Sequence, residues 1–177
     1  SALVPFFARV PIRTGFRGEC RFGLVNDIRP FDKNVLDQTV KRFFALGVDV
    51  DDKEREQIPR PRLKVSSENL ARLKVKFGLD EEIAVALMPG AAFGPAKQWP
   101  LEYYADLASR LAAAGVNVWV LGSNKERVLG LELTRLADHS KVRNFCGKTS
   151  LGDAIDLLGT ALVAVGNDSG LMHVAAA

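Results

Sequence analysis

Short apolar runs and amphipathic stretches alternate along residues 66–177, and this alternation predicts an α/β fold. The apolar runs are rich in β-branched residues, as buried strands are, whereas the stretches between them space their apolar residues as helices do. Strands that alternate with helices form a parallel sheet, and ligands bind beyond the carboxyl ends of such strands. The predicted strands are 83–88, 116–121, 142–145 and 162–165. The first predicted helix begins at a cap at Ser66 or Ser67 and ends at Phe77. The other predicted helices are 100–114, 125–138, 151–159 and one that begins at 171.

Residues 1–46 have a different pattern, and a charged, proline-containing stretch separates them from the alternating region. In this first part we expect the end of a helix over 3–10, a short strand over 14–16 and an amphipathic helix over 34–46. The stretch 47–65 has few apolar residues and is typical of an interdomain connection. The sequence therefore predicts two domains joined by this connection.

The segment 162–177 places a predicted strand, a turn of small and polar residues and the start of a helix in one stretch. The strand has the unalternated pattern of one buried on both faces, and the first N–H groups of the helix have no partner within it. An anionic ligand above Asp168, Ser169 and Gly170 would satisfy those groups. Two simpler interpretations stay open: Asp168 or Ser169 caps the helix, and His173 is a packed core histidine.

The loop after strand 83–88 is long for a strand-to-helix connection and carries Lys97 just before the next helix. Loops longer than a connection needs are often functional. The Lys97 ammonium could reach a phosphate whose other oxygens contact the backbone of small residues such as Gly90 and Ala91. A solvated lysine is the alternative. The loop matches neither the dinucleotide-binding nor the P-loop glycine pattern, which argues against a dehydrogenase or a P-loop NTPase.

Two further loops, 122–126 and 147–151, follow predicted strands at the same sheet edge. The Glu126 carboxylate could accept both hydroxyls of a ribose, as acidic residues do in other nucleotide-binding folds. A first-turn glutamate stabilised by the helix dipole is the competing interpretation. Ser150 is predicted to be a helix cap, and the backbone near Thr149 could line an adenine.

Length and composition fit a soluble enzyme fragment. The chain has 177 residues, of which 47% are hydrophobic and 25% charged. No apolar run approaches the roughly 20 residues that a membrane span needs, and no part of the sequence is expected to be a signal peptide. Cys20 and Cys146 have no metal or redox spacing and are expected to be free thiols in a reducing cytosol. The chain begins without methionine and stops shortly after a predicted helix starts, which suggests an internal piece of a longer protein.

The positive charge of the chain lies at its beginning. Residues 1–30 hold five arginines against Glu19 and Asp27, so that they carry the whole net charge of +3. Arginine suits bidentate contacts with carboxylate or phosphate, so an acidic partner is one interpretation and a solvated basic surface is the other. Nucleic acid is a poorer candidate, because few aromatic residues accompany these arginines and the rest of the chain has no positive excess.

Four strings of the sequence together resemble glycosyltransferase family 9. They are PGAAFGPAKQWP, LGSNKE, GKTSL and NDSGLMHVAAA, in that order, and RTGFRGECRFGLVNDIRPFDK near the beginning extends the likeness to nearly the whole chain. The resemblance implies a GT-B fold, in which two Rossmann-like domains face each other across a cleft. Residues 1–46 would then be the tail of the acceptor-side domain, and residues 66–177 would be a truncated sugar-nucleotide-binding domain.

The resemblance also implies an activity. It implies inverting transfer of L-glycero-D-manno-heptose from ADP-heptose to the inner-core heptose of lipopolysaccharide, without a metal or another cofactor. A cytoplasmic enzyme that associates peripherally with the inner membrane surface is implied, and no nucleic acid partner is expected. The proposed general base of the family is an aspartate near the amino terminus of its members, and no residue here matches it. We therefore expect this piece alone to be inactive.

Carried onto this sequence, the family pattern assigns roles to particular residues. Lys97 and the turn at Ser169 and Gly170 would hold the diphosphate, with Asp168 and His173 beside the phosphate and the transferred sugar. Lys97 and Asp168 are the catalytic candidates on the leaving-group side. The candidate nucleotide-binding residues are Gly90, Ala91, Ala92, Phe93, Lys97, Gly122, Glu126, Thr149, Asp168, Ser169, Gly170 and His173.

Two other functions stay open. One is a different GT-B transferase or a sugar-nucleotide epimerase, which would share the phosphate loops but prefer a uridine nucleotide. The other is a non-catalytic nucleotide-binding module, which the missing general base favours for this piece alone. Titration with ADP, UDP and ADP-heptose separates the enzymatic alternatives.

Overall fold

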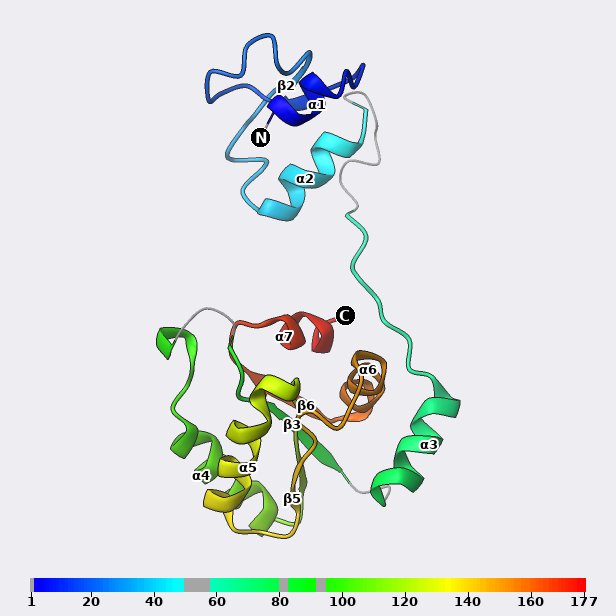
Figure 1. Ribbon diagram of the computed structural model, residues 1–177, viewed down its shortest axis with the longest axis vertical. Helices are drawn as coiled ribbons and strands as arrows, with labels where there is room; N and C mark the ends of the chain where they lie inside the picture. The colour runs from blue at the N-terminus through cyan, green and yellow to red at the C-terminus, as the bar shows by residue number, and fades with distance from the viewer. Residues whose placement is uncertain (1, 50–57, 80–82, 92–94) are drawn as a thin grey trace. The chain divides into compact units, whose positions relative to one another are not determined.

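The chain forms two compact units, Ser1–Arg60 and Pro61–Ala177, in a computed structural model that describes residues 2–49, 58–79, 83–91 and 95–177 (Figure 1). Within these ranges each unit has a parallel sheet of its own, with two strands in the first unit and four in the second. The boundary between the units lies inside the stretch 47–65 that the sequence marks as a connection.

The first unit contains a short pair of strands with a helix before and a helix after it. Its elements are α1 (Leu3–Phe7), β1 (Thr14–Phe16), β2 (Asp27–Arg29) and α2 (Thr39–Gly47). β1 pairs in parallel with β2, and Gly15 in β1 lies against the side chain of Val25. Among the residues described in this unit, Val25 is the buried hydrophobic one, so the unit has little core of its own.

Both helices of this unit are shorter than predicted. α1 ends before Val10 because Arg9 has a left-handed φ of 55°, which does not continue a right-handed helix. α2 begins after the predicted start at Asn34, because the Asp32 carboxylate accepts the Asn34 N–H at 2.8 Å and holds that segment in a turn. The sequence does not predict β2, since a three-residue strand with two charged side chains has no apolar pattern.

The second unit is built on a four-stranded parallel sheet, as the alternating pattern predicts. Its strands are β3 (Ala84–Met88), β4 (Asn117–Val120), β5 (Val142–Asn144) and β6 (Val163–Gly166), in the order β5-β4-β3-β6. In the central strand, Leu87 pairs with Val120 of β4 and with Val165 of β6. This register brings the carboxyl ends of the strands, and the loops that follow them, to one edge of the sheet.

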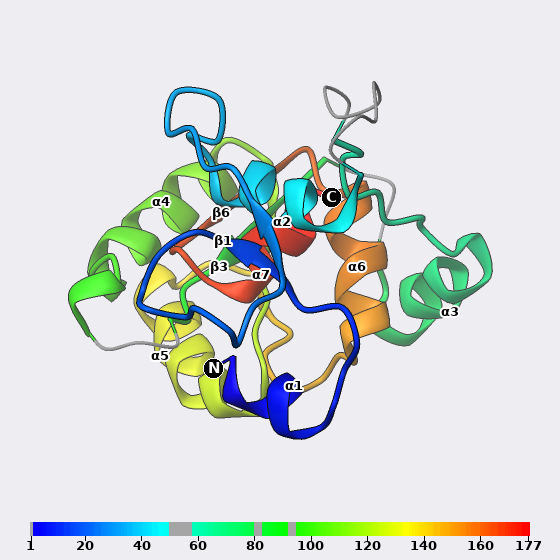
Figure 2. The same ribbon diagram turned by 90° about the horizontal axis from the view of Figure 1, so that it is seen from above.

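Helices cover both faces of this sheet, as Figures 1 and 2 show. α4 and α5 pack on one face, while α3, α6 and α7 pack on the other. Two short 3-10 helices, η2 and η3, lie in the loops after β3 and β4. The bounds are α3 (Ser67–Phe77), η2 (Pro95–Lys97), α4 (Leu101–Ala113), η3 (Asn124–Glu126), α5 (Arg127–Ala137), α6 (Leu151–Thr160) and α7 (Gly170–Ala175).

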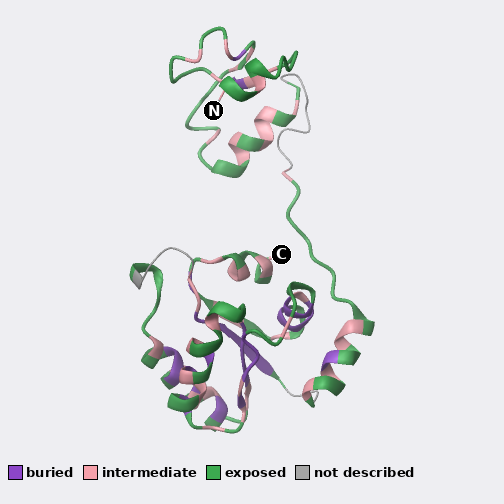
Figure 3. Ribbon diagram, in the orientation of Figure 1, coloured by how far each residue is buried: buried purple, intermediate pink, exposed green. Residues whose placement is uncertain are grey.

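Each face of the sheet has its own hydrophobic core, and Figure 3 shows the buried residues gathered in the strands and on the inner sides of the helices. Val85, Leu87 and Val120 pack toward Tyr104 and Leu133 on the α4 and α5 side. The other core holds Ala84, Ala86, Met88, Trp119, Leu121, Phe145, Leu73, Leu157 and Leu158. The alternation of side chains along each strand divides it between the two cores.

The prediction that β6 is buried on both faces is wrong. Val163 is 50% exposed and Leu162, just before the strand, is 69% exposed. β6 is the outer strand of the sheet, next to β3, so one of its edges has no strand beside it in the described part of the chain. Ile83, predicted to start the first buried strand, is likewise exposed and lies before β3 begins.

Helix caps in the second unit follow the sequence signals. The Ser66 hydroxyl accepts the N–H of Asn69 at the start of α3, and Gly78 ends that helix with a left-handed φ of 55°. Ser150 caps α6 in a capping box with Asp153, as predicted for a serine at that position. Pro100, predicted as the first helical residue of α4, is instead its N-cap.

The two cysteines are free: Cys20 is exposed, whereas Cys146 is buried. Burial raises the pKa of the Cys146 thiol to about 12, so this thiol stays protonated at neutral pH. Among the helices in the described ranges, none has the length and apolar character needed to cross a membrane.

Candidate functional site

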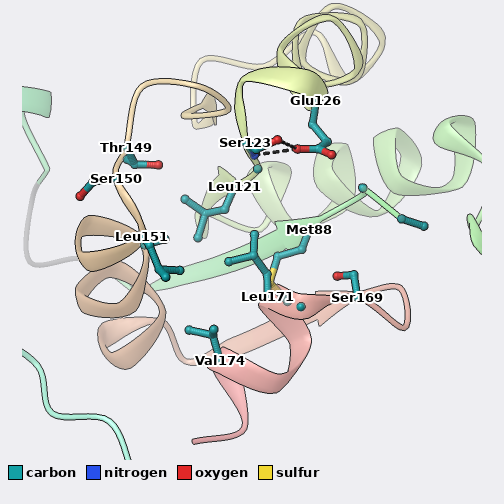
Figure 4. Close-up of a pocket in the computed structure, with 15 residues that line it drawn as sticks. Met88, Leu121, Ser123, Glu126, Thr149, Ser150, Leu151, Ser169, Leu171 and Val174 are labelled. Carbon is teal, nitrogen blue, oxygen red and sulfur yellow. Dashed lines mark hydrogen bonds between the residues drawn. The ribbon is translucent and has the colours of Figure 1, made fainter. Parts of the chain in front are cut away.

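A pocket of about 520 Å³ opens at the carboxyl edge of the four-stranded sheet. It lies between the loops that follow β3, β4 and β5 and the first turns of α6 and α7, as Figure 4 shows. This is the edge at which the parallel topology predicts a ligand. The lining residues are Met88, Gly90, Ala91, Leu121, Gly122, Ser123, Glu126, Thr149, Ser150, Leu151, Ala154, Ser169, Gly170, Leu171 and Val174.

One part of the pocket is apolar. Met88, Leu121, Leu151, Leu171 and Val174 extend into it from four different segments (Figure 4). Met88 and Leu121 are buried at the sheet edge, whereas Leu171 and Val174 lie about one turn apart on α7. An apolar slot that is bordered by a few hydroxyl and carboxylate groups suits a flat ring that carries polar substituents.

Glu126 provides the carboxylate at the rim of the pocket. Its Oε2 atom accepts hydrogen bonds from the backbone N–H of Ser123, at 2.7 Å, and from the Ser123 hydroxyl. These bonds form a capping box at η3, so Glu126 is a first-turn residue, as the competing interpretation of the sequence holds. The second oxygen, Oε1, accepts no hydrogen bond from the residues that the structure describes, and it is therefore available to a ligand hydroxyl.

Gly90 leaves the space that the Glu126 side chain occupies. A Cβ atom at Gly90 would lie 2.7 Å from Cγ of Glu126 and 3.2 Å from its Oε1. Both distances are shorter than ordinary van der Waals contact, so a larger residue would displace the carboxylate. The loop after β3 and the loop after β4 are thus in close contact at Gly90 and Glu126.

The loops after β4 and β5 are joined in a similar way. The N–H of Gly147 donates to the carbonyl of Gly122 at 3.0 Å, and Gly147 has a left-handed φ of 71°. A Cβ atom at Gly147 would lie 2.9 Å from Oδ1 of Asn124 and 3.1 Å from its Cα. Glycine is therefore required both for the backbone conformation and for the close approach of the two loops.

Lys97 and Asp168 form an ion pair beside the pocket. The Lys97 Nζ lies 2.7 Å from Oδ2 of Asp168, and the two side chains are 46% and 63% exposed. The hydrogen bond and the charge of Lys97 hold the pKa of the Asp168 carboxyl below its usual value, and the nearby His173 acts in the same direction. An exposed pair of this kind contributes little to stability.

Asn167, between β6 and α7, is buried and joins three segments. Its Oδ1 atom accepts the backbone N–H of Trp99 at 3.0 Å and the hydroxyl of Tyr104 at 3.2 Å. Its Nδ2 atom donates to the carbonyls of Pro89 at 2.8 Å and Gly90 at 3.4 Å. The turn that carries Asp168 is thereby attached to both ends of the loop that carries Lys97.

Most of the predicted binding residues come together. Gly90, Ala91, Gly122, Glu126, Thr149, Ser169 and Gly170 line the one pocket. Lys97, Asp168 and His173 do not line it, although the first two pair with each other next to Ser169. Ala92 and Phe93 lie outside the described residues.

Of the simpler interpretations at the start of α7, the helix cap is correct in position only. Ser169 is the N-cap residue, but its side chain makes no capping hydrogen bond, and Asp168 pairs with Lys97. The interpretation of His173 as a core residue is wrong, because His173 is exposed.

The sequence reasoning missed the apolar half of the pocket. Met88 and Leu121 stand where β3 and β4 meet their loops, so their place at the carboxyl edge was a usable signal. Leu171 and Val174 have the spacing of one helix face, as do Leu151 and Ala154 on α6. The sequence does not single out Asn167, because asparagine is common in tight turns, where its side chain bonds to the nearby backbone.

No group of three or more His, Cys, Asp or Glu side chains is arranged to hold a metal ion in the ranges that the structure covers. That the reaction needs no metal stays a prediction.

Comparison with known proteins shows which family the chain belongs to. The family model described as glycosyltransferase family 9 (heptosyltransferase) matches residues 1–177. The chain belongs to glycosyltransferase family 9. This confirms the resemblance carried by the four loop strings and by the arginine-rich beginning.

Two curated members of glycosyltransferase family 9 match the whole of this chain. Lipopolysaccharide heptosyltransferase 2 of Escherichia coli K12 is 42% identical over 186 residues, which cover 100% of this chain and 53% of that protein. Lipooligosaccharide heptosyltransferase 2 of Haemophilus ducreyi is 37% identical over 193 residues, which cover 100% of this chain and 54% of that protein. The chain thus spans about half the length of these curated relatives.

A solved structure of glycosyltransferase family 9 supports the fold. The structure of E. coli ADP-heptose lipopolysaccharide heptosyltransferase II matches with a TM-score of 0.74 and 40% sequence identity, over 99% of this chain and 56% of that one. The predicted α/β architecture with parallel sheets is therefore confirmed. The roles of single residues stay predictions.

Proposed function

We propose that Pro61–Ala177 binds the ADP part of ADP-L-glycero-D-manno-heptose, and that the full-length protein transfers the heptose to the inner-core heptose of lipopolysaccharide. The observation that carries this proposal is the pocket at the sheet edge, which is lined by residues from the loop strings that the sequence shares with the family. The named relatives are heptosyltransferases of lipopolysaccharide or lipooligosaccharide, and one of them carries ADP-heptose in its name.

The pocket offers a distinct place to each part of the nucleotide. The apolar slot between Leu121, Leu151 and Leu171 takes the faces of adenine, with the Thr149 backbone at its edge. The free oxygen of Glu126 accepts the ribose hydroxyls. The diphosphate then lies over Ser169 and Gly170, where the Lys97 ammonium can leave Asp168 and contact a phosphate oxygen.

The reaction proposed is an inverting substitution. The acceptor hydroxyl oxygen forms a bond with the anomeric carbon from the face opposite the diphosphate, the bond from that carbon to the diphosphate oxygen breaks, and ADP leaves with the electron pair. Lys97 offsets the charge that develops on the departing oxygen. A general base must take the hydroxyl proton, and none is assigned in this chain. We further propose that the protein works in the cytoplasm, peripherally at the inner membrane surface.

The proposal predicts a nucleotide preference. The full-length protein should bind ADP about fivefold or more tightly than UDP, because the larger purine buries more apolar surface in the slot. Isothermal titration calorimetry with ADP, UDP and ADP-heptose measures this directly. Equal or reversed affinities would favour the uridine-dependent transferase or epimerase, which the named relatives do not favour. ADP binding without any heptose transfer by the full-length protein would favour the non-catalytic module.

Three of the five arginines in residues 1–30, namely Arg13, Arg17 and Arg21, are candidates for contact with the acceptor, and the structure divides them into two groups. Arg13 donates to the carbonyls of Leu24 and Val10 at 2.7 and 2.6 Å, and Arg21 donates to that of Phe16 at 3.1 Å, so both stabilise the backbone of their own unit. Arg17 is exposed and makes no ion pair within the described part of this unit. Of the three, Arg17 is therefore the residue that we propose meets the acidic acceptor.

Replacing Arg17 with glutamine should raise the Michaelis constant for the acceptor about threefold and weaken its salt dependence, while ADP affinity stays unchanged. Arg13→Gln is the matched variant in the same unit, and it should lower thermal stability more than it changes acceptor kinetics. Steady-state kinetics at two salt concentrations give the answer. An unchanged Michaelis constant for Arg17→Gln at low salt means that this surface is only solvated.

A further inference from the structure

Asn167 occupies a position that the proposed function leaves unexplained. It is only 7% exposed, it does not line the pocket, and yet it stands between Gly166 at the end of β6 and Asp168 of the ion pair. We propose that Asn167 is a positioning residue, which holds the Lys97 loop and the Asp168 turn in register so that Lys97 can meet the donor diphosphate. This inference rests on the proposed function of the pocket.

The amide of Asn167 uses all of its hydrogen-bonding capacity. Oδ1 has two acceptor positions and meets two donors, the N–H of Trp99 and the hydroxyl of Tyr104. Nδ2 has two hydrogens and meets two acceptors, the carbonyls of Pro89 and Gly90. Burial raises the pKa of Tyr104 to about 12, so its hydroxyl remains a donor at neutral pH.

Neither aspartate nor alanine can replace this amide. Aspartate has nearly the same shape, but its second oxygen would face two carbonyl oxygens in a buried place, where the repulsion and the lost donor are both costly. Alanine would leave the groups of Trp99, Tyr104 and Pro89 without partners. Asparagine is thus selected by two donors on one side and two acceptors on the other.

The contacts of Asn167 fix both ends of the loop after β3. At one end is Gly90, which lines the pocket and accommodates Glu126. At the other end is Trp99, two residues after Lys97, whose ring packs against Tyr104 with centroids 4.8 Å apart. A shift of Asn167 would therefore move Lys97 relative to the pocket without removing any group that touches the nucleotide.

A double-mutant cycle tests this coupling in the full-length protein. Lys97→Ala is combined with Asn167→Ala, and kcat/KM for ADP-heptose and Kd for ADP are measured. We expect Lys97→Ala to lower kcat/KM about tenfold or more in the wild-type background but less than about threefold in the Asn167→Ala background. The second effect is smaller because a displaced Lys97 no longer contacts the diphosphate well, so that its removal changes little. Asn167→Asp, which keeps the shape, is expected to show the same coupling and serves if Asn167→Ala does not fold.

Ser109→Ala is the matched control for a loss of stability. In the wild type, the Ser109 hydroxyl donates to the carbonyl of Ala137 at 2.6 Å between α4 and α5, and Ser109 does not line the pocket. Its effect and that of Lys97→Ala should combine independently. Independent effects of Asn167 and Lys97 would overturn the inference and make Asn167 a purely structural residue. A wild-type protein that binds no ADP overturns the proposed function and the inference together, whereas ADP binding with independent effects overturns the inference alone.

Discussion

Replacing Lys97 with alanine in the full-length protein is expected to lower kcat/KM for ADP-heptose roughly tenfold to a hundredfold. A charge-assisted hydrogen bond to a phosphate is worth about 1.5–3 kcal/mol, and the bond strengthens as negative charge builds up on the leaving diphosphate. Most of the loss should therefore appear in kcat. Steady-state kinetics with a fixed acceptor concentration measure the effect.

Lys41 offers a matched control for this variant. It forms a similar exposed ion pair with Asp37, with the Nζ atom 2.8 Å from Oδ1, in the first unit. Lys41→Ala removes the same charge and the same kind of contact, and it should leave kcat/KM nearly unchanged. If the two variants behave alike and both fold normally, Lys97 is a solvated lysine, as the simpler interpretation of the sequence holds.

Replacing Gly90 with alanine is expected to weaken ADP binding about tenfold. The new Cβ would lie 2.7 Å from Cγ and 3.1 Å from Cδ of Glu126, so the Glu126 side chain must leave its capping box with Ser123. The oxygen proposed for the ribose then moves out of place. Calorimetric titration with ADP, together with thermal unfolding, separates this local effect from a general loss of stability.

Gly152→Ala is the matched substitution near the same pocket. The nearest atom to a Cβ at Gly152 is Oγ of Ser150 at 3.8 Å, an ordinary contact, and alanine is favourable within a helix. This variant should bind ADP as the wild type does. Wild-type affinity in Gly90→Ala as well would show that the position of Glu126 does not matter for the nucleotide.

The elements that the sequence predicts well are those with local signals. The cap at Ser66, the end of that helix at Phe77 and the capping serine Ser150 depend on residues close by in the sequence, and the structure has each of them. The parallel sheet follows from alternation alone. The late start of α2 was not predictable from periodicity, because a single hydrogen bond from Asn34 to Asp32 decides it.

The candidate site divides in the same way. Strand ends identify which loops meet, and so the sequence could place Gly90, Gly122, Thr149 and Ser169 at one edge. It could not show that Asn167 contacts Pro89 and Trp99, because the partners are 78 and 68 residues away and any turn residue could have stood there. Contacts of that range depend on how β6 and β3 pair, and they appear only in three dimensions.

The Lys97–Asp168 ion pair also bears on how a catalytic cycle would end. If Lys97 contacts the diphosphate during the reaction, its ammonium can form the ion pair with Asp168 again when ADP leaves. The carboxylate then competes with the spent nucleotide for the same cation, which shortens the residence of ADP and resets the site for the next donor. An exposed pair that adds little to folding could in this way set the rate of product release.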